Sequence, residues 1–238
     1  DMSKKVILTG PQPSGDLHIG NYLGTLQNWV AYTRKYECYF FIADLHSLTE
    51  EYSPKEKRTQ ILTFAAEILA LGVDPKKCTF FVQSDIKEHT ALMWFFNCVT
   101  PVSFLERMTQ FKDKSLMQHQ NINMGLFSYP VLQAADILLY GTDLVPVGID
   151  QVQHIELSRD IARFFNNRFS KTFKEPKPKL TDMPKVMSLS DSMKKMSKSG
   201  DEKSYIALND EPKVIAEKLR KAVADEKGLE NLRALAKI

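Results

Sequence analysis

The sequence predicts an α/β fold, a doubly wound parallel sheet with a helical insertion, and two observations support this prediction. First, short apolar runs alternate with longer segments of helical periodicity, as in a parallel sheet covered by helices. Second, three of the apolar runs end near Gly10, Asp44 and Gln83. Ligands of such sheets bind at the carboxyl ends of the strands. The sequence therefore places a binding site near these three residues.

The first half of the chain contains three predicted strands and two predicted helices. Each strand is a short apolar run bounded by turn residues. The first helix begins near His18, after a turn rich in proline and glycine, and its apolar face runs from Ile19 to Trp29. We expect strands at residues 6–10, 38–43 and 79–83, and helices from residue 18 and at 54–71.

The second half resumes the sheet after an insertion. Residues 89–126 are mostly helical in pattern and then irregular, which predicts an insertion at about 85–130. A strand is expected at 144–147 and a helix at 151–165. Asp210 is a predicted helix cap before Pro212. Three prolines are expected only to punctuate the approach to a lysine-rich loop: Pro176, Pro178 and Pro184.

The last segment predicts the start of a C-terminal helical domain that is truncated or incomplete. It has Leu229, Leu232, Leu235 and Ile238 on one stripe, with no stop signal after them. We therefore expect two domains, a main domain at residues 1–204 that includes the insertion and this helical beginning at 205–238.

Composition limits the class of protein. A net charge of +3, with 43% hydrophobic and 26% charged residues, is ordinary for a globular protein. The three cysteines are widely spaced, which favours reduced thiols over a zinc or redox pair. There is no recognisable signal peptide, and the N-terminal Asp1-Met2-Ser3 resembles an addition ahead of the natural start. No apolar run approaches the roughly 20 residues of a membrane span, so we expect a cytoplasmic protein.

Lysines gather near the end of the main domain. The stretch from Lys171 to Lys203 holds nine lysines against five acids, which favours polyanions such as phosphates or RNA. Within it, Lys194, Lys195 and Lys198 lie on a short loop and can neutralise a triphosphate and its leaving pyrophosphate. A solvated loop without a partner remains the alternative for these residues.

The turn before the first helix is a candidate phosphate site. The sequence has no Walker-type phosphate loop, no zinc helix with paired histidines and no serine nucleophile elbow, so no metal held by the protein is expected. Backbone N–H groups at a helix start attract phosphate, and Gly20 would let a flat adenine lie against the backbone. His18 and Asn21 can donate hydrogen bonds to an α-phosphate. Alternatively, the glycines only form turns.

Asp136 is unusual because it lies in the apolar segment Ala134–Tyr140. A carboxylate in such a segment is expected to be paired or functional. The alternative is that Asp136 caps a helix.

Five blocks, in order and spacing, resemble the tryptophanyl-tRNA synthetases, class I aminoacyl-tRNA synthetases of bacterial or organellar type. Residues 12–22 resemble the first class I signature, with Asn21 where a second histidine is usual, and residues 195–199 match the second signature without change. The two signatures lie about 175 residues apart. The blocks between them are residues 106–112, 135–140 and 148–157. The likeness covers about residues 5–222 and implies a Rossmann-like catalytic domain.

The resemblance implies a role for each matching residue. His18, Lys195 and Lys198 would be catalytic, and Asp136 would accept the indole N–H of tryptophan. The other tryptophan-binding residues would be Tyr129 and Gln151 at the α-amino group and His46, Val145 and Val147 around the side chain. The ATP-binding residues would be Gln12, Pro13, Ser14, Gly20, Asn21, Gly148, Ile149, Asp150, Val186, Lys195, Met196, Ser197, Lys198 and Ser199.

The resemblance implies ATP-dependent activation of L-tryptophan, with Mg²⁺ neutralising phosphate charge, and transfer to the 3′ end of tRNA(Trp). It also implies a homodimer built through the insertion. A tyrosyl-type synthetase and a non-catalytic RNA-binding paralogue are the alternatives. One departure is that residues 225–228 directly join segments that a longer stretch separates in the family. The sequence is therefore either cut or incomplete there, and no residue is assigned to the anticodon.

Overall fold

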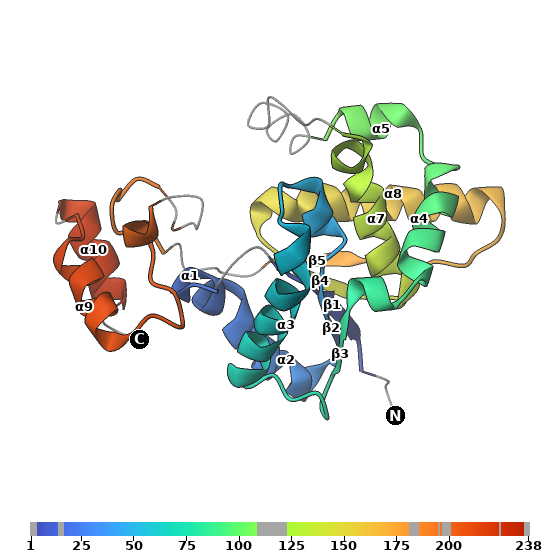
Figure 1. Ribbon diagram of the computed structural model, residues 1–238. Helices are drawn as coiled ribbons and strands as arrows, with labels where there is room; N and C mark the ends of the chain where they lie inside the picture. Colours follow the sequence, from blue (N-terminus) through green and yellow to red (C-terminus); the bar gives the residue numbers. More distant parts are fainter. Residues whose placement is uncertain are drawn as a thin grey trace. The chain divides into compact units, whose positions relative to one another are not determined.

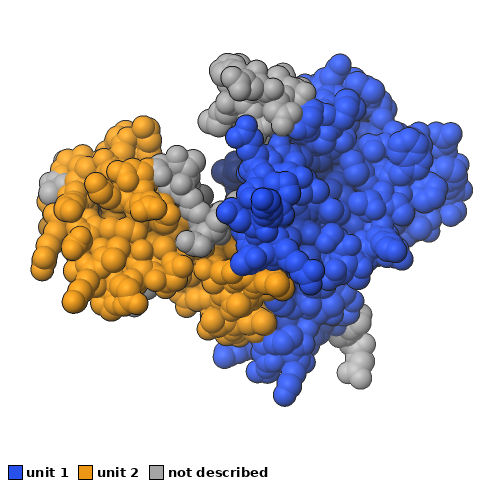
Figure 2. Space-filling view, in the orientation of Figure 1, with its two compact units in different colours: residues 1–13, 32–61, 74–181 blue, residues 14–31, 62–73, 182–238 orange. Residues whose placement is uncertain are grey.

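The computed structural model describes residues 4–13, 17–108, 123–180, 186–194, 196, 201–223 and 225–235. The chain forms two compact units, each made of three separate stretches of sequence (Figure 2). Unit 1 contains residues 1–13, 32–61 and 74–181, and unit 2 contains residues 14–31, 62–73 and 182–238.

Unit 1 is built on a parallel sheet of five strands in the order β3-β2-β1-β4-β5 (Figure 1). The α/β fold is therefore confirmed. The strands are β1 (Val6–Thr9), β2 (Glu37–Ile42), β3 (Thr79–Val82), β4 (Leu144–Val147) and β5 (Lys177–Leu180). The first four agree with the predicted strands to within a residue at each end. Chain order runs outward from β1 to β3 on one side and reaches β4 and β5 on the other, so the switch point lies between β1 and β4.

The fifth strand was not predicted. Its proline was expected to lie in the approach to the lysine-rich loop, and that expectation is wrong. Strand β5 contains Pro178, which pairs with Val145 of β4, and Leu180 pairs with Val147. Among the described strands β5 pairs with β4 alone, so it lies at an edge of the sheet. Proline is tolerated in an edge strand because its missing N–H costs no bond within the sheet.

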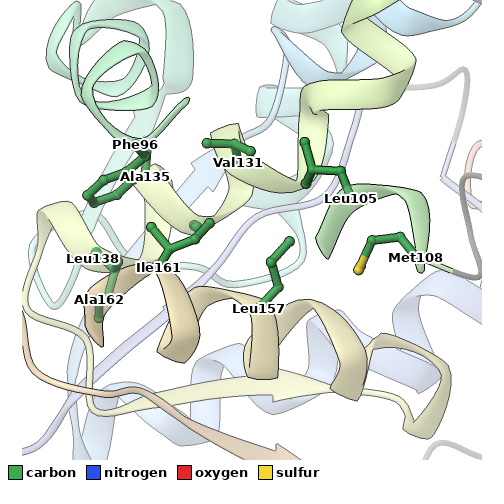
Figure 3. Close-up of a cluster of buried hydrophobic side chains, with 10 residues drawn as sticks. Phe96, Leu105, Met108, Val131, Ala135, Leu138, Leu157, Ile161 and Ala162 are labelled. Carbon is green, nitrogen blue, oxygen red and sulfur yellow. The ribbon is translucent and has the colours of Figure 1, made fainter. Parts of the chain in front are cut away.

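Four helices of unit 1 share a hydrophobic core. They are α4 (Glu88–Asn97), α5 (Val102–Glu106), α7 (Met124–Leu139) and α8 (Val152–Arg168). Figure 3 shows their side chains pointing toward one another, with Phe96 of α4, Val131 of α7 and Ile161 of α8 fully buried. Helix α8 confirms the helix predicted at 151–165. The described part of the predicted insertion forms α4, α5 and the start of α7.

The first predicted helix is interrupted. It consists of α1 (Ile19–Asn21), a π-helical stretch η1 (Tyr22–Leu26) and α2 (Gln27–Lys35). Helix α3 (Pro54–Ala70) agrees with the helix predicted at 54–71. Both α2 and α3 contribute residues to both units. Short π-helical stretches inside helices often occur at functional sites, and this one begins at Tyr22, the last residue of the first signature.

The C-terminal part of unit 2 contains α9 (Pro212–Arg220) and α10 (Glu226–Leu235). The predicted cap, Asp210, is wrong by one residue, because Glu211 is the N-cap and makes no side-chain cap bond. Asp210 instead accepts the Ala207 N–H at 2.8 Å and the Lys218 ammonium at 2.6 Å. Among the described residues no helix is long and apolar enough to cross a membrane.

Candidate active site

Asp136 lies in the last turn of α7 with 1% of its surface exposed. The helix begins at an N-cap, Asn123, whose side chain accepts the Leu126 N–H. The helix-cap alternative for Asp136 is therefore wrong. Neighbouring positions of α7 are apolar and buried, so the helix directs the carboxylate into the interior of unit 1.

Three side chains from other elements surround this carboxylate. Nε2 of His46, in the 3-10 turn η2 (His46–Thr49), lies 2.7 Å from Oδ2 of Asp136. Nδ1 of His89, in α4, lies 2.6 Å from Oδ1, and Nε2 of Gln83 donates to Oδ1 at 2.8 Å. Gln83 opens the 3-10 turn η3 (Gln83–Asp85) directly after β3. We call Asp136, His46, Gln83, His89 and Tyr140 the Asp136 cluster; Tyr140 joins through its hydroxyl, 2.8 Å from Nε2 of His89.

The cluster keeps its carboxylate charged. Burial by itself raises the pKa of Asp136, but hydrogen bonds and charge interactions from His46 and His89 outweigh it and lower this pKa below its ordinary value. Asp136 is therefore an anionic acceptor at neutral pH.

Of two further predicted tryptophan-binding residues, Tyr129 packs against the cluster, and Gln151 makes its hydrogen bond elsewhere. The Tyr129 ring meets the His46 ring edge-on, with centroids 6.2 Å apart, and its hydroxyl lies 3.1 Å from Nε2 of His154. The structure therefore brings Tyr129, His46 and Asp136 together. Gln151 instead donates to Asp150 at 3.2 Å.

The predicted valines line the same part of unit 1. Val145 and Val147 of β4 are buried in one hydrophobic cluster with Ile137, the residue after Asp136. The switch point of the sheet, next to β4, therefore lies close to the Asp136 cluster.

The predicted ATP residues of unit 1 follow the ends of β1 and β4. Gln12 and Pro13 come after β1, where the N–H of Ala43 donates to the Pro11 carbonyl at 2.9 Å. After β4, Asp150 is exposed, and a Cβ on Gly148 would lie 2.7 Å from its carboxylate. Ile149 is 79% exposed.

The predicted ATP residues of unit 2 bring the two signatures together. The His18 N–H donates to Oδ1 of Asn21 at 3.1 Å, which leaves the Asn21 amide NH₂ as the predicted phosphate donor. His18 covers Gly20, since a Cβ there would lie 2.9 Å from Nδ1 of His18 and 3.7 Å from Cβ of Val186. Gly20 therefore has a steric reason to be glycine. The N–H of Met196 donates to the Val186 carbonyl at 2.9 Å.

An apolar core lies behind these residues. Leu23, after the first signature, is buried in one cluster with Val186 and with Met196 of the second signature. A backbone bond joins the same regions, because the Ile19 N–H donates to the Ile206 carbonyl at 3.0 Å. Five predicted residues lie outside the described part of the chain: Ser14, Lys195, Ser197, Lys198 and Ser199.

Three members of the Asp136 cluster were given no role from the sequence. Gln83 was noted as a strand end, without a role. His89 and the Tyr140 hydroxyl had no assigned function. Tyr140 is the last residue of the block 135–140, which resembles the synthetases. That position is the one feature of the sequence that pointed to Tyr140.

Comparison with known proteins agrees with this geometry. The family described as tRNA synthetases class I (W and Y) matches residues 2–238. The chain belongs to this family. The tryptophan–tRNA ligase of Clostridium tetani is 49% identical over 229 residues, which cover 95% of this chain and 68% of that protein. The tryptophan–tRNA ligase of Rickettsia conorii is 49% identical over 225 residues, covering 93% of this chain and 68% of that protein.

Solved synthetases of this family share the fold. The tryptophanyl-tRNA synthetase of Campylobacter jejuni, complexed with ADP and tryptophan, has a TM-score of 0.85 and 40% identity over 93% of this chain and 68% of that chain. The tyrosyl-tRNA synthetase of Archaeoglobus fulgidus, complexed with L-tyrosine, has a TM-score of 0.72 and 23% identity over 99% of this chain and 71% of that chain, and so shows the fold alone. Within the family, similarity favours the tryptophanyl branch.

Proposed function

We propose that this chain is a tryptophan–tRNA ligase, which activates L-tryptophan with ATP and transfers it to the 3′ end of tRNA(Trp). The observation that carries the proposal is the Asp136 cluster, a buried anionic acceptor in a chain 49% identical to tryptophan–tRNA ligases. A carboxylate in a dry site pairs with an N–H donor and rejects a ligand without one, because that ligand leaves the acceptor unpaired.

Tryptophan selection is assigned to residues of unit 1. Asp136 accepts the indole N–H, while Val145, Val147 and His46 surround the ring. Tyr129 stays protonated, since burial raises the pKa of its hydroxyl to about 12. If the Tyr129 hydroxyl donates to Nε2 of His154, its oxygen lone pairs remain for the α-ammonium group of the substrate.

ATP binding is assigned to the residues that the resemblance implied after β1, after β4 and in the two signatures. Among the described residues no group of His, Cys, Asp or Glu could hold a metal ion. Mg²⁺ is expected to enter with ATP, because it is usually bound through substrate phosphates. The tryptophan carboxylate attacks the α-phosphorus and pyrophosphate leaves. His18, Asn21, Lys195 and Lys198 stabilise the phosphate charge that develops. A ribose hydroxyl at the tRNA 3′ end then attacks the acyl carbon and releases AMP.

The direct test is pyrophosphate exchange with each amino acid in turn, followed by charging of tRNA(Trp). We expect exchange with tryptophan at a kcat/KM at least about a hundredfold above that for tyrosine or phenylalanine, as hydrogen-bond-based selection produces. Preference for tyrosine would establish the tyrosyl alternative. A folded protein without exchange for any amino acid would establish the non-catalytic paralogue.

A homodimer and a cytoplasmic location stay predictions. The dimer is supported by exposed apolar side chains in the described part of the insertion. These are Trp94 (68% exposed), Phe95 (59%), Val102 (60%) and Met124 (72%). Exposed apolar residues that gather on one region often mark a protein interface.

A further inference from the structure

The hydrogen bonds of the Asp136 carboxylate fill all but one of its acceptor positions among the described residues. An ionised carboxylate offers about four acceptor positions, two on each oxygen. Among the described residues, Oδ1 has two partners, Nδ1 of His89 and Nε2 of Gln83, and Oδ2 has one, Nε2 of His46. One acceptor position, on Oδ2, remains for a ligand.

The orientation of Gln83 is fixed independently of Asp136. Its side chain is fully buried, and its amide oxygen accepts the backbone N–H of Leu45 at 3.1 Å. This bond identifies the amide oxygen, so the NH₂ group is the part that faces Asp136. A substituent without an NH₂ group here would leave Oδ1 with a single partner.

His89 is held at both ring nitrogens and packs against two phenylalanine rings. Its side chain is fully buried, its Nε2 lies 2.8 Å from the Tyr140 hydroxyl, and its ring packs near Phe41 and Phe81, with centroids 6.1 and 6.0 Å away. Burial, and then the charge of Asp136, raises the pKa of Tyr140 to about 12. Tyr140 therefore keeps its proton and can donate it to Nε2. With Nε2 as the acceptor of that bond, Nδ1 of His89 carries the proton that is donated to Asp136.

We propose that Gln83 and His89 are positioning residues for amino-acid selection, which occupy Oδ1 of Asp136 and leave one acceptor position on Oδ2 for a ligand N–H. This rests on the proposed function, in which that N–H belongs to the substrate. The ligand class is an amino acid whose flat aromatic side chain carries a ring N–H. An analogue methylated at the indole nitrogen has no proton to donate and is rejected.

The first test compares two substitutions of His89. His89→Leu removes the donor, so the carboxylate turns and the KM for tryptophan in pyrophosphate exchange rises about tenfold, with kcat and the KM for ATP within about twofold. The discrimination against phenylalanine falls by the same factor. His89→Asn keeps an N–H at the position of Nδ1, so we expect tryptophan KM and selectivity within about threefold of the unmodified protein. Phe96→Leu, a fully buried change in the same helix, is the matched control and leaves selectivity unchanged.

A double-mutant cycle decides whether His89 acts through Asp136. In an Asp136→Ala background, His89→Leu should no longer change the ratio of kcat/KM for tryptophan over phenylalanine. An undiminished effect there, or failure of His89→Asn to restore selectivity, overturns the inference. Gln83→Met, which removes the other donor, gives the same test if His89→Leu does not fold. The proposed function fails separately, if the unmodified protein exchanges no tryptophan or Asp136→Ala alone leaves selectivity intact.

Discussion

Asp136 shows how single residues make a buried charge tolerable. Removing a carboxylate from water is costly, and neighbouring donors must offset that cost. His46, Gln83 and His89 supply three such bonds, all 2.8 Å or shorter. The same bonds that stabilise the charge also fix its direction. Stability and selectivity are therefore coupled at this residue.

Asp136→Ala should reduce the preference for tryptophan over phenylalanine. A hydrogen bond from an indole N–H to this carboxylate stabilises the complex by about 1.5–3 kcal/mol, so the ratio of kcat/KM should fall about ten- to a few hundredfold. The melting temperature, measured on the same samples, should also fall, because two histidines and a glutamine lose a partner. A lower melting temperature with unchanged selectivity would assign Asp136 a structural role alone.

The free energy of unfolding at acid pH should reveal the lowered pKa of Asp136. Its pKa in the folded protein is lowered, so its contribution to stability is present above the unfolded pKa of about 3.9 and is lost as pH falls through the folded pKa. The difference in free energy of unfolding between the unmodified protein and Asp136→Asn should be constant from pH 8 to 5. It should shrink below about pH 4. Urea unfolding at each pH measures it, and a difference that grows toward acid pH contradicts the lowered pKa.

Lysines of the second signature should act on the phosphates. Lys195→Ala or Lys198→Ala should slow tryptophanyl-adenylate formation by roughly two to four orders of magnitude, the range of lost transition-state electrostatics. Tryptophan affinity, measured by calorimetry without ATP, should change little. Lys213→Ala, at an exposed lysine outside the second signature, is the control. An equal collapse of tryptophan affinity would exclude a role confined to the phosphates.

Some residues of the Asp136 cluster could be predicted from the sequence, and others could not. Asp136 stands out because a charge interrupts an apolar run. His89 and Gln83 do not, since they meet Asp136 from 47 and 53 residues away. No local pattern marks which polar residue will face another element, so the cluster became visible only in the folded chain.

At the level of elements, the strands with ordinary apolar patterns were predicted well. Strand β5 was not, because alternating lysine and proline hide an edge strand that its pairing with β4 stabilises. The π-helical stretch after α1 was also missed, because Tyr22 to Leu26 fit an ordinary helical period.

The end of β1 requires glycine at position 10. A Cβ there would lie 2.6 Å from the Phe41 ring and 2.6 Å from the Phe41 carbonyl oxygen, and the backbone of β2 is held by its pairing with β1. Gly10→Ala should therefore lower the free energy of unfolding by about 1–3 kcal/mol, as overpacking does. Chemical denaturation measures this. Gly125→Ala, whose tightest contact is 3.1 Å to the Asn123 side chain, should destabilise the protein less, because a side chain can shift where the backbone of β2 cannot.

For the whole molecule, the sequence predicted two domains in simple succession, a division that stays a prediction. The structure shows compact units that alternate along the chain. Composition and periodicity describe neighbours in sequence, so they do not reveal that residues 14–31 share a unit with residues 182–238. The resemblance linked the two signatures by function, and the apolar cluster around Leu23 and Met196 gives that link a physical basis.

The assembly of the whole molecule can be tested at Trp94. If the predicted homodimer forms through the insertion, Trp94→Glu introduces a charge into an apolar interface and should shift the mass in solution from two chains to one. Light scattering at micromolar concentration measures this mass. Leu62→Glu, at another exposed apolar residue (59%), should leave it unchanged. A Trp94→Glu protein that keeps the mass of two chains excludes the side chain from the interface.

Because the two units alternate along the chain, residues that pack together in unit 2 are synthesised at different times. Leu23 leaves the ribosome early, but its apolar partners Val186 and Met196 follow about 160 residues later. At about 5–20 residues per second, this delay is roughly 8–30 seconds. During that interval Leu23 lacks these two partners, so a nascent chain stalled before residue 186 should expose more of Leu23 to chaperones.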